Sequence, residues 1–395
     1  MKTRNIVALA TLGFASIAGP IGYMGCRNSK TDEAIVRELT GDVFIDSQIN
    51  KLNDKNFDVR RDAAKQLAET KNPITEKTLL STLNDKDWTA RYYSAWGLGK
   101  IKSKEAVQPL ILLLNDSQHK VVSASVIALG EIGDKAATKP LCNILLSSKD
   151  YEDYSYVINA LGKIKDKEAM STLEHYLFKT MLTSNINATG KALDSISHED
   201  TIKILLDHLK SNDNDKVWRS VDTLANLKAK ETTPSLIPLL EHNSVDVRRS
   251  VIRAFNQIED ESVVKPLCNR FQKEAGYIQS DIIFALNSIK SKESVPSLIE
   301  FINHEEEFIR GNIAMTLGNI GDKRATKILC NRLKYDSSPQ VRLKAAEALG
   351  KIADQASLET LFEVRKILIE YQGSRDLREE VDKAICKAVL GPCIH

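Results

Sequence analysis

The stretch Ala348-Leu349-Gly350-Lys351-Ile352 decides the fold of this chain, because versions of it recur at a fixed spacing. Close copies end at Ile101, Ile132, Ile164 and Ile320, and weaker copies end at Thr70, Ile196, Leu227, Ile258 and Ile289. Each end point, here called the anchor of its repeat, lies 31 or 32 residues after the previous one. A fixed period of this length in a 395-residue chain indicates stacked repeats rather than two or three separate domains.

Each period has room for two helices, and two columns of apolar residues support them. Three residues before each anchor stand Leu67, Leu98, Leu129, Leu161, Leu193, Leu224, Phe255, Leu286, Leu317 and Leu349. Nine residues after the anchors stand Leu110, Leu141, Leu173, Leu205, Leu236, Leu267, Leu298, Leu329 and Leu361. Such columns are typical of helices with one buried face. The sequence predicts an all-α, right-handed α–α superhelix of about ten two-helix repeats.

The turns between the predicted helices carry residues that are typical of helix ends. Two residues after most anchors is a good N-cap for the next helix: Ser103, Asp134, Asp166, Asp260, Ser291, Asp322 and Asp354. Proline recurs close behind these caps, where a helix tolerates it. Glycines such as Gly318 and Gly350 stand just before the anchor, where they let neighbouring backbones approach. We expect the first helix of each pair (helix A) outside and the second (helix B) lining a concave inner face.

Arginine recurs ten residues before the anchor, at Arg60, Arg91, Arg248, Arg310 and Arg342. With the Ala-Leu-Gly-x-Ile segment it forms a motif that resembles the HEAT-like repeats of the phycocyanobilin-lyase type, over roughly residues 43–388. The resemblance implies a HEAT solenoid used mainly as a scaffold. It also implies a structural role for the arginines, which would bond to an acidic or backbone group of an adjacent repeat. Tyr154 and Ile186 depart from the motif.

The N-terminal segment has a different composition. Lys2 and Arg4 precede an uncharged run that ends at Cys26, which is a secretory-signal layout. Residues 1–26 are interpreted as a signal peptide or membrane anchor, residues 27–42 as a linker, residues 43–390 as the solenoid and residues 391–395 as a tail. A lipoprotein with Cys26 acylated, an uncleaved anchor, a cleaved soluble form and a cytosolic chain remain open. The expected localisation is a membrane-associated or exported one, in a bacterial-type envelope.

Bulk charge argues against a nucleic-acid partner. The chain has 55 basic and 53 acidic residues, whereas nucleic-acid binders usually carry a basic stripe. Neither a P-loop nor a nucleophile-elbow motif is present in the sequence. We therefore expect no enzyme activity, no cofactor, no bound metal and no small-molecule substrate.

Cysteine and histidine provide weak candidates for chemistry. Cys142, Cys268 and Cys330 share one register two or more repeats apart, so we expect buried core thiols rather than a metal site. Cys386 and Cys393 flank a Gly-Pro break, and a disulfide between them is one alternative to two free thiols in an oxidising compartment. His198-Glu199 and His304-Glu305 superficially resemble the metal-binding pairs of deoxyhypusine hydroxylase, but too few pairs are present.

The positions nine and five residues before each anchor avoid the core columns, so we expect them to face the concave groove. The candidate partner-binding residues are Tyr92, Tyr93, Trp96, Ile127, Trp218, Arg249, Arg253 and Phe284. Tyr151, Tyr154 and Tyr156 could extend this set. The alternative is that the aromatic residues fill the core. Exposed aromatic and arginine side chains are frequent anchors of protein interfaces.

The leading hypothesis is thus a non-enzymatic scaffold, tethered to or exported across a membrane, that binds a protein segment in its groove. A phycobilin-lyase-like enzyme or a tetrapyrrole chaperone is the second hypothesis, because the repeat type resembles that family. A nucleic-acid-binding HEAT protein, of the kind that excises alkylated bases, is the third, and the balanced charge disfavours it.

Overall fold

A computed structural model of the protein describes residues 42–147, 154–370 and 374–390. These residues form 22 α-helices in eleven successive pairs and contain no strand. The A helices are α1 (Val43–Lys51), α3 (Glu76–Thr82), α5 (Val107–Leu112), α7 (Thr138–Leu146), α9 (Met170–Lys179), α11 (His198–His208), α13 (Thr233–Leu236), α15 (Val264–Phe271), α17 (Val295–Phe301), α19 (Thr326–Tyr335) and α21 (Gln355–Glu370). The B helices are α2 (Phe57–Thr70), α4 (Trp88–Lys100), α6 (His119–Ile132), α8 (Tyr154–Ile164), α10 (Thr183–Ile196), α12 (Asn214–Asn226), α14 (Val245–Ile258), α16 (Tyr277–Ile289), α18 (Glu307–Ile320), α20 (Pro339–Ile352) and α22 (Arg375–Leu390).

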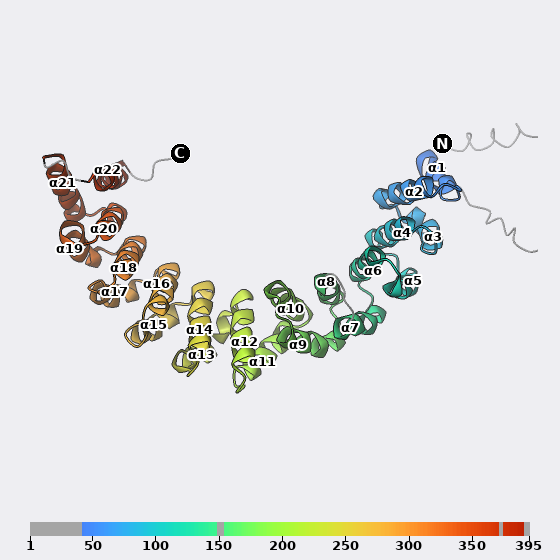
Figure 1. The fold of residues 1–395 in the computed structure, drawn as a ribbon, viewed down its shortest axis with the longest axis horizontal. Helices are drawn as coiled ribbons and strands as arrows, with labels where there is room; N and C mark the ends of the chain where they lie inside the picture. Colours follow the sequence, from blue (N-terminus) through green and yellow to red (C-terminus); the bar gives the residue numbers. More distant parts are fainter. Residues whose placement is uncertain (1–41, 148–153, 371–373, 391–395) are drawn as a thin grey trace, which may run out of the picture. The chain divides into compact units, whose positions relative to one another are not determined.

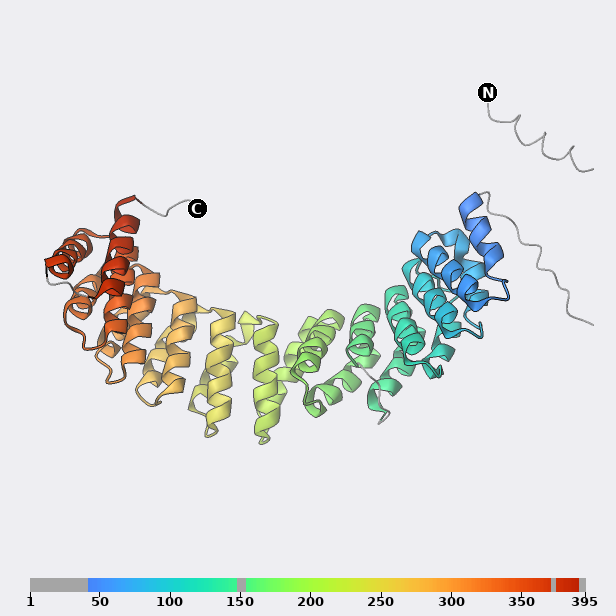
Figure 2. The same cartoon turned by 45° about the horizontal axis from the view of Figure 1, so that its top comes forward.

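The pairs stack side by side in two layers. Each B helix packs on the next B helix, from α2 to α22, and the A helices form the second layer. Within Phe44–His395, taken as one unit, the row of pairs curves and the B layer lies on its inner side (Figure 1). Figure 2 shows the same two layers from another angle. The expected α–α superhelix and the expected placement of the B helices are both confirmed.

The two apolar columns form the core between the layers. All ten residues of the B column and all nine of the A column are completely buried. Because each large apolar side chain buried from water contributes roughly 1.5–3 kcal/mol, these columns hold the two layers together along the whole row.

The expected N-caps are confirmed, but they cap a different element. The side chain of Asp134 accepts a hydrogen bond from the amide of Ala136 at 2.9 Å, and Asp322 accepts one from the amide of Arg324 at the same distance. In most repeats the capped segment is a single 3₁₀ turn, such as Lys135–Ala137, and the α-helix begins after it. The cap also links repeats, since Thr326 donates to Asp354 at 2.6 Å across 28 residues.

Glycine allows the B helices to approach closely. A Cβ atom built on Gly318 would lie 2.5 Å from the Cα atom of Ala348 in the next B helix, and one on Gly350 would lie 2.7 Å from that of Ala384. Real Cβ atoms do not approach other atoms this closely. The glycines that stand two residues before an anchor therefore set the spacing of the B layer in those repeats.

Several sequence-based expectations lie outside the described residues. These are the signal or anchor with Cys26, the tail with Cys393, and Tyr151. In the part of the chain that the structure describes, no helix combines the length and the apolar character needed to cross a membrane.

Candidate functional site

A ladder of arginines lies along the turns between the A and B helices. In α4, Nη1 of Arg91 donates to the backbone carbonyls of Asp85 and Lys86 at 2.8 and 3.2 Å. Its Nε and Nη2 atoms donate to both oxygens of Asp116 in the next repeat, at 2.7 and 2.9 Å. Three further pairs repeat this bidentate arrangement: Arg60–Asp85, Arg248–Glu274 and Arg310–Asp336. The structural role implied by the HEAT resemblance is therefore confirmed for these four arginines.

Arg342 follows this pattern only in part, because its described contacts are with the carbonyls of Asp336 and Ser337 in its own repeat, at 2.7 and 3.4 Å.

The acids that pair with the ladder arginines have lowered pKa values. Burial alone would raise the pKa of Asp336, but hydrogen bonds from Arg310 and from the amide of Ser338, with the charge of Arg310, outweigh it. These carboxylates therefore stay ionised at neutral pH.

Other donors replace arginine at this ladder position in two repeats. The hydroxyl of Tyr154 donates to the carbonyl of Ser147 at 3.3 Å, and Nε2 of Gln279 donates to that of Phe271 at 3.1 Å. Both bonds satisfy carbonyl groups where the preceding A helix ends, whereas the arginines reach carbonyls further along the turn. Three repeats have an apolar residue instead, at Val122, Ile186 and Val217.

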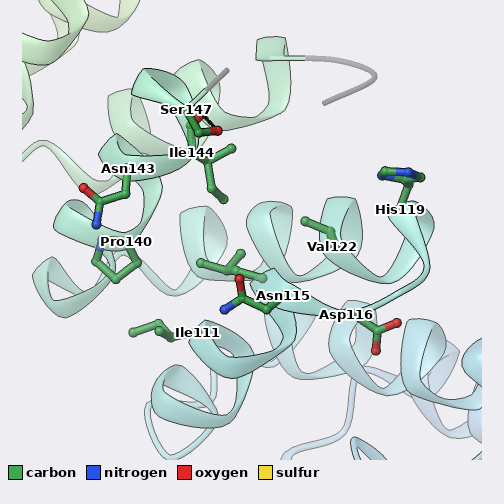
Figure 3. Close-up of a pocket in the computed structure, with 10 residues that line it drawn as sticks. Ile111, Asn115, Asp116, His119, Val122, Pro140, Asn143, Ile144 and Ser147 are labelled. Carbon is green, nitrogen blue, oxygen red and sulfur yellow. Dashed lines mark hydrogen bonds between the residues drawn. The ribbon is translucent and has the colours of Figure 1, made fainter. Parts of the chain in front are cut away.

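An open cavity of about 440 Å³ lies where the ladder is interrupted at Val122 (Figure 3). Its walls come from α5, α6 and α7 and from the turn before α6. Apolar walls are formed by Ile111, Leu114 and Ile144, whereas Asp116 and Ser147 contribute polar atoms. Sequence reasoning missed this cavity, although the absence of arginine from the register was the signal that could have revealed it.

The surface of the B layer that faces away from the A layer, here called the B face, carries the predicted partner-binding residues. Positions nine and five before the anchors are half-buried or exposed, except for Ser280, which is buried. At one end, Tyr92 and Tyr93 are half-buried and their rings meet edge to face with centroids 5.1 Å apart. Both pack partly against the core. Trp96 lies half-buried, with the Lys100 ammonium 5.9 Å from its ring centroid.

Ile127 is half-buried on α6, one repeat before Tyr154. Tyr154 is half-buried too and contacts Tyr176, whereas Tyr156 is exposed. Trp218 is half-buried, packs partly against the core and donates from Nε1 to Asp215 at 3.2 Å. Both interpretations of the aromatic residues therefore describe part of the set.

The middle of the B face brings Arg249, Arg253 and Phe284 together, and adds Tyr277 and Asp281. Nε of Arg249 lies 2.7 Å from Oδ2 of Asp281, and Nε of Arg253 lies 3.5 Å from the same oxygen. The Arg249 guanidinium also stacks 4.6 Å from the centroid of the Tyr277 ring. Arg253, Asp281 and Phe284 border a cavity of about 300 Å³. Two arginines thus share one carboxylate beside exposed aromatic rings.

Sequence reasoning missed two exposed aromatic residues on consecutive B helices. Tyr277 on α16 and Phe308 on α18 are 57% and 60% exposed, against 40% for Phe284. Both stand twelve residues before their anchors, an offset that was not expected to face the groove. Aromatic residues at one offset in consecutive repeats were the signal that could have identified them.

The cysteine and histidine candidates are separated in space. Cys142 and Cys268 are buried as expected, and burial raises the pKa of both thiols. Cys330 is only half-buried although it shares the register of the other two, so the core expectation is wrong there. Cys386 is exposed on α22, and its proposed partner lies outside the described residues.

The histidines of the two His-Glu pairs bind protein groups. His198 lies 2.5 Å from Asp194 and 2.8 Å from Glu231, and these two hydrogen bonds raise its pKa. His304 accepts a hydrogen bond from the amide of Glu306 at 3.1 Å. Among the described residues, no three or more His, Cys, Asp and Glu side chains are grouped so that they could hold a metal ion.

The repeat geometry, the arginine ladder and the capped turns define a HEAT-type solenoid. The profile of HEAT repeats matches residues 45–130, 76–153, 138–221, 218–287 and 264–350, which together span residues 45–350. The chain therefore belongs to the HEAT-repeat family. The profile of the PBS lyase HEAT-like repeat matches residues 341–361, which confirms the resemblance to that repeat type.

Solved structures with the same fold include the karyopherin Kap121p and Kap95p. Kap121p is 13% identical with a TM-score of 0.60, and the match covers 88% of this chain and 46% of that one. Kap95p, solved with RanGDP, is 12% identical with a TM-score of 0.56, and the match covers 89% and 57%. The chain thus spans about half the length of these two proteins, and the likeness concerns the fold. No curated protein matches the chain.

Proposed function

We propose that this protein is a non-enzymatic scaffold whose B face binds an extended or helical segment of a partner protein. The observation that carries the proposal is the cluster of Arg249, Arg253, Tyr277 and Phe284 around Asp281. Isolated apolar side chains are normal on a protein surface, whereas several adjacent aromatic residues with arginines are typical of interface anchors.

The arrangement of these side chains suits the binding of a peptide better than the catalysis of a reaction. The arginines are fixed by Asp281, so they present a preorganised guanidinium surface, and little side-chain entropy is lost on binding. The aromatic rings beside them offer apolar area that a partner side chain can cover. A fold of the same type holds a peptide segment in the complex of Kap121p with the extreme C-terminus of the protein phosphatase Cdc14p. Those observations support a binding surface for one chain segment.

The test compares two phenylalanines that differ mainly in the layer they occupy. Phe284 on α16 is 40% exposed on the B face, and Phe362 on α21 is 49% exposed in the A layer. A photo-reactive phenylalanine analogue at each position would be activated in the native cells. We expect a discrete adduct with a partner from position 284 and none from position 362.

The same pair gives an affinity test once the partner is identified. Phe284→Ala should weaken binding roughly tenfold or more, since interface anchors contribute about 2 kcal/mol, while Phe362→Ala leaves it unchanged. Equal adducts at both positions, or equal affinity of both variants, would show that the B face is not the binding surface.

A membrane tether is the second part of the proposal, and it rests on the sequence. Lys2, Arg4, the uncharged run and Gly25-Cys26 support a signal or an anchor. The protein should fractionate with membranes, and Cys26→Ala should alter its processing. An unprocessed, water-soluble chain that begins at Met1 in intact-mass analysis would rule out both. In an exported protein, non-reducing peptide mapping should also find Cys386 linked to Cys393.

The enzyme alternative has narrower support. The lyase-type profile matches a single repeat, residues 341–361. A phycobilin-lyase-like enzyme or a tetrapyrrole chaperone would form a coloured adduct or complex on addition of bilin, which a scaffold would not. A nucleic-acid-binding HEAT protein would show salt-dependent binding to duplex DNA.

A further inference from the structure

The arginine ladder defines a recurring slot in this protein. In four slots a guanidinium lies between two backbone carbonyls of the turn before its own B helix and a carboxylate that follows the next A helix, as at Arg91. At Arg310, for example, the acceptors are the carbonyls of His304 and Glu305 at 3.0 and 2.7 Å, and the carboxylate of Asp336 at 2.8 Å. The slot is therefore built to accept one planar cation with several N–H donors.

One slot without its own arginine is filled from elsewhere in the chain. Ile186 replaces arginine in α10, and Arg219 from the following B helix, α12, reaches back to the turn before α10. Its Nη1 atom donates to the carbonyl of Leu177 at 3.3 Å and to the carbonyl of Thr180. The side chain of Arg219 is buried there, with 3% of the residue exposed. The slot thus takes a guanidinium that is supplied by a different element.

The slot at Val122 is open instead. The counterparts of the carbonyls that the ladder arginines reach belong to Asp116 and Ser117. Among the described residues, no hydrogen bond to either carbonyl is present. Asp116, the first of these two residues, lines the cavity of about 440 Å³ (Figure 3). At the third apolar position, by contrast, the Val217 side chain is completely buried.

We propose that the cavity at Val122 binds an arginine side chain presented by a partner polypeptide. The planar fork of a guanidinium matches two adjacent carbonyl acceptors, which an ammonium matches less well. The apolar walls at Ile111, Leu114 and Ile144 suit the aliphatic stem of the same side chain. A cavity of this size is in the range of small-ligand sites. An anion is disfavoured, because the ends of two A helices and Asp116 face the space.

The carboxylate of Asp116 is already held by Arg91 at 2.7 Å. A partner arginine in the cavity is therefore expected to bond mainly to backbone carbonyls. We expect reversible binding that is weaker than the contact of a ladder arginine with its own slot. The hydrogen-bond geometry of Arg91 is the reference for the bound arginine. The inference deepens the proposed function, since it names one side chain that the partner carries at the edge of the solenoid.

The full-length protein would be titrated with acetyl-Gly-Arg-Gly-amide while the methyl resonances of Ile111, Val122 and Ile144 are followed by NMR. The same peptide with lysine, or with citrulline in place of arginine, serves as a probe of matched size. We expect saturable shifts at these three residues for arginine. Citrulline should bind about tenfold more weakly, because charge-assisted hydrogen bonds are roughly twice as strong as neutral ones.

Val122→Arg fills the slot from within and should abolish the peptide shifts at Ile111 and Ile144 while raising the melting temperature. Val245→Arg makes the same change at an exposed position outside the cavity and should keep the binding. If Val122→Arg does not fold, the arginine–citrulline comparison on the unaltered protein carries the test alone. Equal binding of arginine and citrulline, shifts scattered over the surface, or no shift at millimolar peptide would overturn the inference. The adducts expected at position 284 do not depend on this result, so failure of the slot and failure of the B face are distinguishable.

Discussion

Replacing Gly318 with alanine tests whether the spacing of the B layer depends on glycine. Gly318 lies in α18, and a Cβ atom there would be 2.5 Å from the Cα atom and 2.6 Å from the Cβ atom of Ala348 in α20. The nearest obstacle is backbone, so no rotamer change relieves it. Carbon atoms prefer separations of roughly 3.5–4.0 Å, and the two helices would have to move apart by about 1 Å.

Two opposing terms set the magnitude. Inserting a methyl group into a close-packed core costs roughly 1–3 kcal/mol, and contact with backbone places Gly318→Ala at the upper end. Alanine is a better helix former than glycine by about 1 kcal/mol, which offsets part of this cost. We therefore expect Gly318→Ala to lower the free energy of unfolding by about 2 kcal/mol.

Gly311 provides a matched control in the same helix. A Cβ atom there would meet only the Cγ atom of Lys344, at 4.0 Å. Gly311→Ala should therefore show the propensity gain alone and stabilise the helix by about 1 kcal/mol. The two variants make the same chemical change in α18, yet we expect opposite signs.

Hydrogen exchange in native conditions is the suitable assay, combined with urea unfolding. A repeat array of this length does not need to unfold in one step, so a single free energy is insufficient. Amides of α18 and α20 should exchange faster in Gly318→Ala and slower in Gly311→Ala. Stabilisation by both variants would refute the claim that close helix approach requires glycine. Rescue of Gly318→Ala by Ala348→Gly would show that the clash is with the Cβ atom of residue 348 rather than with its Cα atom.

Three further outcomes follow from the same contacts. The lowered pKa of Asp336 means that the unfolded chain takes up this proton first as pH falls. The Arg310–Asp336 pair therefore makes its full contribution to stability above about pH 4, the pKa of an aspartate in the unfolded chain, and loses it below that pH. On acidification the urea midpoint should fall less steeply in Arg310→Gln than in the unaltered protein. Equal slopes would contradict this expectation. The NMR titration of His198 should give a pKa above 6.5, because hydrogen bonds to its neighbouring carboxylates raise it, and a value below 6.5 would exclude these bonds. Leu317→Ala should cost roughly 2–5 kcal/mol in urea unfolding, and a loss below about 1 kcal/mol would mean that the column is not core.

The sequence was sufficient for the architecture because the core is a local pattern repeated many times. Positions such as Leu129 and Leu317 could be placed in the core by their offset alone, and both are completely buried. Local backbone detail was less accessible. A capping side chain fixes only the first turn, so it did not reveal the 3₁₀ geometry at Lys135–Ala137. Helix α13 ends at Leu236 and continues as a 3₁₀ turn, Ile237–Glu241, in which Pro238 lacks an amide hydrogen.

The candidate site was predicted less completely, since surface positions have no fixed core contact to constrain them. Arg249, Arg253 and Phe284 were selected from two offsets, and the structure places them around Asp281. Tyr277 belongs to the same surface but stands at another offset, because the start of a B helix presents different positions from its middle. Neither spacing nor composition could show that one carboxylate holds two arginines.

A repeat protein supplies its own internal comparison, and this makes a departure from the pattern informative. An apolar residue at the ladder position removes a guanidinium that would otherwise satisfy turn carbonyls, and unsatisfied carbonyls near the protein interior are costly. In the repeat of Ile186 the hydrogen bond is supplied by Arg219, which reaches the carbonyl of Leu177 from the next B helix. At Val122 an open cavity is present instead. If that cavity held only water, Val122→Arg should be neutral or stabilising without affecting any ligand. The arginine peptide therefore separates a docking slot from a mere gap in the ladder, because only a docking slot discriminates arginine from citrulline.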